Sequence, residues 1–441
     1  MIPAALTTVA CLLVVWLLRN RTVWVLGLIM ALYVAIPSQA DGLIVPFLHP
    51  ASYLTLALVG QHLVTRDRSE LRLLVRPGVP VIIGLVLVMS LSMLDLLNPW
   101  QSDPQWVVST DLRIFVVPFL LFPLTLIELR RRPASQKTLR RLLLIMALVQ
   151  VVIAYVQYTS DMEQWVFWRS YYELSYWWTD TFPIPLGTMG HPLQLAAFLA
   201  MCIPLLARLK SPITAVIISG VLLYACALST GRASTALAAL GVVFVIVWHG
   251  RRWLAAGAAA ALAGALGFEF WRSEGAAALR DKVQDDQGSA RLRAQALQWA
   301  IEHLDEYLWF GYPGGHDLRG TGILRSSLEN GYLIAGLAFG LTFSLGLLLL
   351  HLYTMLRPIV ATRAATPETV ATFTVWVGFF ASSSFMGYAV DGRSFWLIAA
   401  MAWAAAFPLT TSEATLDQGQ TDAGADSSVS TGTTPGLSAA G

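Results

Sequence analysis

The stretch LRRLLLIMALVQVVIAYVQ, residues 139–157, decides the fold class, because no charged residue follows Arg141 within it. A helix that crosses a bilayer needs about 20 predominantly apolar residues, and backbone polar groups in lipid have to pair within the helix. Runs of the same kind recur along most of the chain. The stretch is therefore predicted to be one of several membrane-spanning helices.

The composition agrees with this interpretation. Hydrophobic residues make up 56% of the 441 residues and charged residues only 13%, whereas soluble domains carry about 25% charged residues. Such a chain cannot cover a large surface that faces water, which excludes a soluble globular protein. The three cysteines, Cys11, Cys202 and Cys226, fall in separate apolar runs, so they are expected to be buried rather than to bind a metal.

About thirteen spanning helices are predicted on the basis of length and apolar character. They lie at residues 2–18, 22–36, 47–64, 77–96, 112–127, 139–157, 191–207, 212–229, 233–248, 253–271, 331–356, 369–387 and 395–409. The predicted fold class is all-α: a polytopic membrane protein with about 12–13 transmembrane helices and one large extracytoplasmic loop.

Basic residues gather in every second loop, which predicts the orientation. The loop before residue 142 contains Arg130, Arg131, Arg132, Lys137, Arg140 and Arg141. The tight connection between 212–229 and 233–248 contains one basic residue, Arg232. The short loop before 395–409 also contains one, Arg393. Because loops rich in Lys and Arg stay on the cytoplasmic side, we expect the N-terminus outside and the C-terminus inside. The helix ends around His191 and Arg232 and the long loop 272–330 are therefore predicted to lie on the outer side of the membrane.

Five regions follow from this topology. We expect an N-terminal transmembrane bundle at 1–157, central transmembrane helices with an aromatic outer loop at 158–271, an extracytoplasmic catalytic loop at 272–330, C-terminal transmembrane helices at 331–409 and a cytoplasmic tail at 410–441. The Trp- and Tyr-rich loop 158–190 suits either sugar stacking or the head-group layer. The tail has almost no large apolar residue and is predicted to be disordered.

Two motifs lie at predicted outer helix ends. In GTMGHPLQLAAFL, residues 187–199, His191 precedes a Pro suited to the first turn of a helix. Its imidazole is expected either to bind a hydroxyl or phosphate oxygen or to cap the helix. In STGRAS, residues 229–234, Arg232 is surrounded by small polar residues. Its guanidinium suits bidentate phosphate binding, and the alternative is a snorkelling anchor.

Two further motifs lie in the long loop and at its end. DKVQDDQGSARLRAQALQWAIEH, residues 281–303, predicts a helix with Arg291 and Arg293 near its start, and the alternative is an amphipathic helix on the outer leaflet. FGYPGG, residues 310–315, predicts a loop whose backbone approaches a ligand closely. In LENGYLIAGLAFG, residues 328–340, Glu329 is a candidate general base, and Glu329 or Asn330 could instead cap the helix.

In this order, the four motifs resemble the O-antigen ligase and polysaccharide polymerase superfamily of bacterial membrane glycosyltransferases over about residues 180–350. Two positions depart from its pattern. Ligases are similar in having a His immediately before the Asn, where this chain has Glu329, which favours a polymerase-like member. Leu193 and Gln194 follow Pro192, where the family more often has an Asn.

The resemblance implies a glycosyltransferase that needs neither metal nor cofactor and joins glycans linked to undecaprenyl pyrophosphate. It also implies a location in the bacterial cytoplasmic (inner) membrane, with the active site facing outside. It assigns Arg232 and Arg291 to the pyrophosphate, with Arg293 in reserve, and Glu329 as the base. His191 or His316 would position the acceptor, and Arg325, Asn330 and Tyr332 are further substrate-binding candidates. The expected partners are the glycan donor, the acceptor and membrane lipid, with a chain-length regulator kept as a candidate and no nucleic acid.

Three alternatives remain open at this point. The first is a ligase that transfers glycan to a lipid or protein acceptor, and the second is a flippase or other transporter of lipid-linked glycans. The third is a peptidoglycan-type polymerase, for which Asp281, Asp285 or Asp286 would supply the acidic residue.

Overall fold

The computed structural model describes residues 2–36, 48–65, 78–98, 108, 111–159, 184–229, 231–250, 257, 291–292, 294–312, 328, 330–381 and 389–408. Within these ranges the regular structure is entirely helical, which confirms the predicted all-α class. The predicted span 253–271, apart from residue 257, and the tail 410–441 lie outside the described residues.

The helices of the first part of the chain follow the apolar runs. They are α1 (Ile2–Leu17), α2 (Thr22–Ala35), α3 (Pro50–Thr65), α5 (Val79–Ser92) with the 3₁₀ continuation η2 (Met93–Leu97), the π-helical η3 (Asp111–Val116) with α7 (Val117–Arg131), and α8 (Ala134–Thr159). The second part contains α10 (Pro192–Leu205) with the 3₁₀ turn η5 (Leu206–Arg208), α11 (Pro212–Leu228), α12 (Arg232–His249), the 3₁₀ turn η6 (Leu304–Tyr307), α15 (Gly331–Phe339), α16 (Leu341–Thr362), α17 (Pro367–Val375) with the π-helical η8 (Trp376–Ala381), and α18 (Ala389–Ala406).

Two predicted boundaries were wrong. The single helix predicted at 331–356 breaks into α15 and α16 at Gly340, whose φ of 99° and ψ of 147° belong to a region that only glycine adopts readily. The last helix, predicted from 395, begins at Ala389. Arg393 therefore lies inside α18 rather than in a loop, and it is fully buried.

Among the residues that the structure describes, four helical stretches are long and apolar enough to cross a membrane: Leu112–Arg131, Ala134–Thr159, Arg232–His249 and Leu341–Thr362. Several others are apolar but shorter, among them Thr22–Ala35, Val79–Ser92 and Pro212–Leu228. Large apolar side chains such as Ile145, Val149 and Val152 of α8 point outward. Because soluble monomers rarely expose large apolar areas, these helices indicate a membrane protein.

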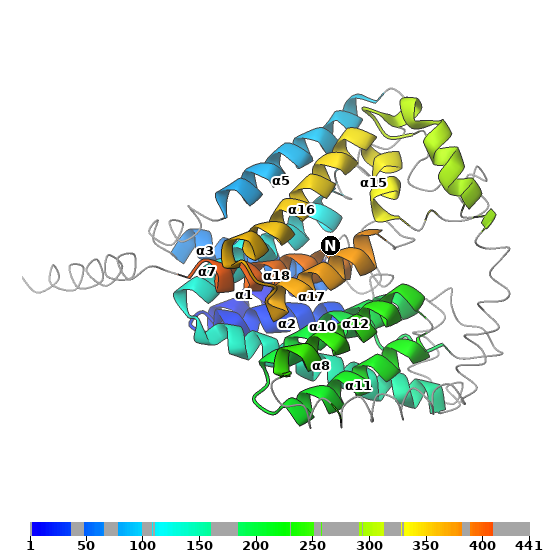
Figure 1. Ribbon diagram of the computed structural model, residues 1–441. Coiled ribbons are helices and arrows are strands. Elements are labelled where there is room, and N and C mark those ends of the chain that lie inside the picture. Colours follow the sequence, from blue (N-terminus) through cyan, green and yellow to red (C-terminus); the bar gives the residue numbers. More distant parts are fainter. Residues whose placement is uncertain are drawn as a thin grey trace, which may run out of the picture.

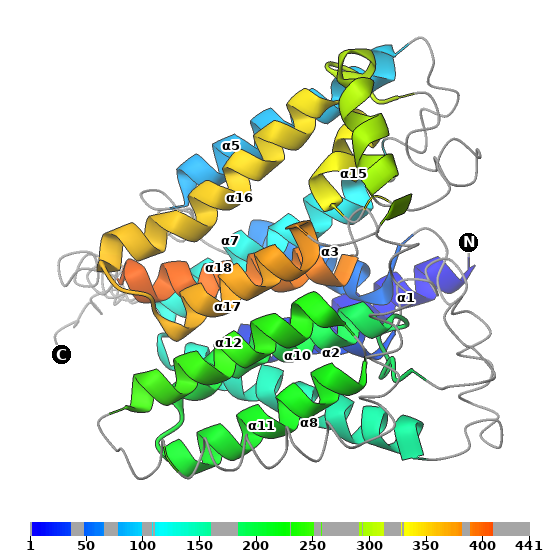
Figure 2. The ribbon, with the colours of Figure 1, turned by 45° about the vertical axis from the view of Figure 1, so that its right-hand side comes forward.

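The helices pack side by side, and α10 lies against α8, α11, α12 and α17 (Figures 1 and 2). Every residue of α10 except Leu193 is buried, and its neighbours are α11, α12 and α17. The pair α5 and α16 lies along one side of the bundle, opposite α8 and α11. α10 is thus a buried helix, and its two ends provide a reference for the polar residues.

We call these two ends the His191 end and the Glu368 end. The hairpin from α11 to α12 brings Gly231 against Leu193 and Ala196 in the first turns of α10, so the start of α12 lies at the His191 end. At the other end of α10, Arg208 contacts Glu368 in the first turn of α17. The sequence motifs at 187–199 and 229–234 therefore share one end of the bundle.

Candidate functional site

The turn 187–190 at the His191 end is held by two glutamines of α8. Gln157 accepts hydrogen bonds from the Leu186 and Gly187 amides at 3.0 and 2.8 Å and donates to the Gly187 carbonyl at 2.8 Å. Gln150 accepts from the Thr188 amide at 2.9 Å and donates to the Thr188 hydroxyl at 2.7 Å. Sequence reasoning missed this role. The available signal was the spacing of seven residues, which puts both glutamines on one face of an otherwise apolar helix.

His191 caps α10. Its Nδ1 atom accepts a hydrogen bond from the Leu193 amide at 3.1 Å, and its side chain is buried. The capping alternative for His191 is therefore confirmed, because a capping acceptor satisfies one of the amides that the first turn leaves without a helical partner. The predicted substrate-binding role of His191 stays a prediction.

Arg232 is the first residue of α12, and its side chain is exposed. The preceding Gly231 packs closely on α10, since a Cβ at this position would lie 3.2 Å from the Ala196 side chain. The hairpin thus fixes the backbone at Arg232 while the guanidinium faces outward. A cation at a helix start gains nothing from the helix dipole, and the exposed position of Arg232 is compatible with anion binding.

Arg291 is also helical and exposed, close before the helix 294–302. That helix buries Ala296 and Ala300 against Tyr307 and against Leu337 of α15. The Tyr307 hydroxyl donates to the Ala300 carbonyl at 2.6 Å, and burial raises the pKa of this phenol. The other loop candidates, Arg293, His316, Arg325 and Glu329, lie outside the described residues, as do Asp281, Asp285 and Asp286.

Two glycines allow the segment 304–312 to dock on the break between α15 and α16. A Cβ at Gly311 would collide with the Ala338 carbonyl, and a Cβ at Gly340 would lie 2.6 Å from the Trp309 carbonyl oxygen. The Tyr312 amide donates to the Leu337 carbonyl at 2.7 Å, completing the contact. Within FGYPGG, Gly311 therefore approaches the backbone of Ala338. Residues 313–315 lie outside the described residues, and the expected approach of this loop to a ligand stays a prediction.

Asn330 and Tyr332 have partners within the protein. The Asn330 side-chain oxygen accepts from the Tyr332 and Leu333 amides at 3.0 and 3.1 Å, which confirms the predicted cap. The Tyr332 hydroxyl accepts from the Trp376 indole at 2.7 Å and lies 3.0 Å from Nδ1 of His351. Both side chains hold the start of α15 in place, and their predicted contacts with substrate stay predictions.

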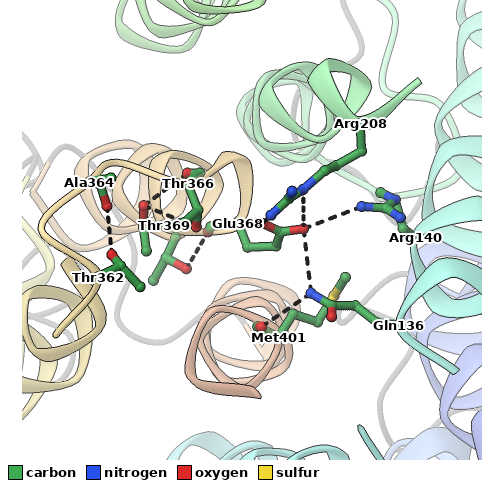
Figure 3. Close-up of polar contacts among 10 residues, drawn as sticks. Gln136, Arg140, Arg208, Thr362, Ala364, Thr366, Glu368, Thr369 and Met401 are labelled. Carbon is green, nitrogen blue, oxygen red and sulfur yellow. Dashed lines mark hydrogen bonds and ion pairs between the residues drawn. The ribbon is translucent and has the colours of Figure 1, made fainter. Parts of the chain in front are cut away.

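A cluster of charges at the Glu368 end was not predicted. The fully buried Glu368 carboxylate accepts two hydrogen bonds from Arg208, at 3.2 and 3.0 Å, and one from Arg140 at 3.3 Å (Figure 3). Gln136 lies 3.4 Å from the same carboxylate and also donates to the Met401 carbonyl. This Glu368 cluster ties together α8, the end of α10, α17 and α18.

Arg393 is a fully buried cation nearer the His191 end. Its guanidinium carbon lies 3.2 Å from the centre of the Tyr33 ring, and one of its nitrogens lies 3.5 Å from the Ser52 hydroxyl. The Tyr33 ring is also stacked on His49. A cation over an aromatic face is stabilised by the ring quadrupole, which helps to explain how Arg393 is accommodated inside α18.

In comparisons with known proteins, no family model and no curated protein matches this chain. The functional argument therefore rests on the residues themselves. At the His191 end and in the docked loop segment, the described residues include two exposed arginines, Arg232 and Arg291, each at or near the start of a helix.

Proposed function

We propose that the protein is a multi-pass membrane glycosyltransferase that acts on glycans linked to undecaprenyl pyrophosphate at the outer face of the bacterial cytoplasmic membrane. Polymerisation of polysaccharide repeat units is the reaction that the sequence favours. In this proposal the His191 end faces outside and the Glu368 end faces the cytoplasm, in agreement with the distribution of Lys and Arg among the loops.

The observation that carries the proposal is the exposure of Arg232 and Arg291, each at or near the start of a helix. An arginine that binds substrate needs an accessible guanidinium. Arg232 and Arg291 also belong to two motifs of the resemblance, which assigns both to the pyrophosphate.

The chemistry asked of these residues is simple. An acceptor hydroxyl oxygen forms a bond with the anomeric carbon of the donor, while the bond from that carbon to the pyrophosphate oxygen breaks. The hydroxyl proton goes to Glu329, and the bonding electrons leave with the lipid pyrophosphate. Guanidinium groups positioned on that leaving group stabilise the negative charge that grows in the transition state.

The test is deletion of the gene in its host, followed by complementation and analysis of surface and lipid-linked glycans. Single repeat units that accumulate on lipid, with long polymer lost, identify a polymerase, whereas full-length polymer left on lipid identifies a ligase. Complementation with Arg232→Ala or Arg291→Ala should reproduce the deletion. Arg19→Ala changes an exposed arginine that contacts Trp16 and is the matched control, expected to restore normal glycans. Normal surface polymer with both variants would exclude the assigned roles.

Transport of a lipid-linked glycan is the second candidate, and buried Arg393 favours it. Ionisable residues inside a membrane protein commonly mark a substrate pathway. In the same deletion strain, a transporter would leave repeat units on the cytoplasmic leaflet. Proteoliposomes would then move the substrate across the bilayer without forming a new glycosidic bond.

A further inference from the structure

The helix 294–302 has three distinct faces. Ala296 and Ala300 are buried against α15, as described above. Gln298 and Glu302 are exposed and joined by a hydrogen bond of 2.8 Å. Between these faces lies a stripe of exposed apolar residues that no other residue of the described part of the chain covers.

Leu297 and Ile301 form this stripe, since residues four apart lie on one face of a helix. Ile301 is 55% exposed and Leu297 is 44% exposed. Exposed leucines are common individually. Two exposed apolar side chains on one helix face, next to further exposed apolar side chains, call for an explanation.

The segment that follows adds larger apolar side chains. Leu308 and Phe310 are exposed, and Trp309 is 58% exposed. The Asn98 amide donates to the Gly311 carbonyl at 3.0 Å, which brings the exposed Leu97 at the end of η2 to the same region. We call these six residues the Trp309 patch: Leu97, Leu297, Ile301, Leu308, Trp309 and Phe310.

The Trp309 patch adjoins a helix that is long and apolar enough to cross a membrane. The Thr342 amide, in the first turn of α16, donates to the Leu308 carbonyl at 3.1 Å. Farther along α16, Leu345 and Leu349 are exposed as well. The apolar exterior of α16 thus continues into the patch. Figure 2 shows the yellow-green helix of this segment lying across the ends of α5 and α16 rather than along them.

We propose that the Trp309 patch is inserted into the boundary between head groups and acyl chains of the membrane, so that the docked loop segment lies on the lipid surface. Three observations favour lipid over a protein partner. The patch continues the apolar exterior of α16, it contains an exposed Trp of the kind enriched at bilayer interfaces, and its helix lies crosswise to the long helices with a polar face beside the apolar one. The inference uses only the membrane location in the proposed function and is independent of glycosyl transfer.

The experiment measures the environment of spin labels on the full chain in vesicles of phosphatidylethanolamine and phosphatidylglycerol. Labels are attached to the variants Ile301→Cys and Trp309→Cys, with Gln298→Cys and Glu302→Cys as matched controls on the polar face. The protein without an introduced cysteine gives the background, because its three cysteines are buried. Collision rates with oxygen, which concentrates in lipid, are compared with those of a water-soluble nickel complex.

We expect a higher ratio of oxygen to nickel collisions at residues 301 and 309 than at 298 and 302. A nickel-accessible label at 301 and 309 would overturn the inference, as would a label shielded from both reagents, which would indicate a protein partner or a second copy. Val152→Cys, on the exposed face of α8, separates the two failures. A lipid-exposed label at 152 with a water-exposed label at 301 rejects only the Trp309 patch, whereas water at both positions rejects the membrane location.

Discussion

The Glu368 cluster and the pair Arg232 and Arg291 use charged side chains in opposite ways. At Glu368, a buried carboxylate and two arginines satisfy one another and hold four parts of the bundle together. Arg232 and Arg291 are exposed, each at or near the start of a helix. The same residue type therefore serves architecture at one end of the molecule and is accessible for binding at the other.

This difference yields a criterion for separating stability from function. A residue of the first kind should lower the stability of the protein when it is replaced, and activity would be lost only as a consequence. A residue of the second kind should leave stability unchanged while activity falls. The four predictions below apply this criterion, from the largest expected loss of stability to the smallest.

Replacing Glu368 should lower the free energy of unfolding more than any other change proposed here. In Glu368→Ala, Arg140 and Arg208 lose their shared partner, and breaking a buried ion pair costs about 4 kcal/mol. The loss should be measured as a change in the free energy of unfolding by denaturant titration in detergent micelles. Glu302→Ala, which removes an exposed carboxylate on the loop helix, is the control and should unfold like the original protein. Equal stability of the two variants would contradict the structural role of the cluster.

Gly340→Ala should cause the second-largest loss of stability. The backbone at Gly340 has a φ of 99°, and a methyl group would press against the Trp309 carbonyl. A non-glycine residue in this region of φ and ψ costs about 3 kcal/mol. The control is Gly60→Ala in α3, where nothing lies within 4 Å of the added methyl. A stable Gly340→Ala variant would mean that α15 and α16 can join into the continuous helix that the sequence predicts.

Tyr332→Phe tests a residue that has contacts inside the bundle and is also a predicted substrate-binding residue. Its hydroxyl links Trp376 and His351 inside the bundle, so its removal takes away the acceptor of the Trp376 indole and one contact of His351, at a cost of about 2 kcal/mol. Tyr353→Phe, at a more exposed position of α16, should leave the thermal unfolding midpoint unchanged. If Tyr332→Phe kept full stability and lost activity instead, Tyr332 would belong with the substrate-binding residues.

Arg232→Gln and Arg291→Gln should have the smallest effect on stability. Exposed substitutions away from packed features change the free energy of unfolding by less than about 0.5 kcal/mol. Removing a group that stabilises transition-state charge lowers the rate by about 10² to 10³, so polymer formation by membranes that contain either variant should fall strongly. If either variant unfolded at a much lower denaturant concentration than the original protein, the arginine would stabilise the fold, as Glu368 does.

Features of the fold that depend on local composition could be predicted from the sequence. Features that depend on contacts between distant residues could not. Most predicted helices are confirmed within a few residues, because long apolar runs leave the backbone no alternative partner. The caps at His191 and Asn330 were also among the predicted alternatives, since capping is local. The helix break at Gly340 was not predicted, because the sequence around a glycine in an apolar run does not indicate its backbone angles.

The Glu368 cluster shows why the rest could not be predicted. Glu368 follows Thr366 and Pro367, a pattern typical of a helix start, and Thr366 does cap α17. Its partners, however, lie 160 and 228 residues away in the chain. For the candidate site, the sequence named Arg232 and Arg291 but not the glutamines of α8 that hold the neighbouring turn.

The hydrogen bond from Asn98 to Gly311 has a consequence for biosynthesis. The two residues are 213 positions apart, and at about 5–20 residues per second the ribosome needs on the order of 10 to 40 s to make the intervening chain. During that interval the end of α5 has neither the loop segment nor α16 to pack against. A nascent chain stalled between these positions should therefore expose α5 to membrane proteases, and the interval is the period in which this protein depends most on the cell's insertion and quality-control machinery.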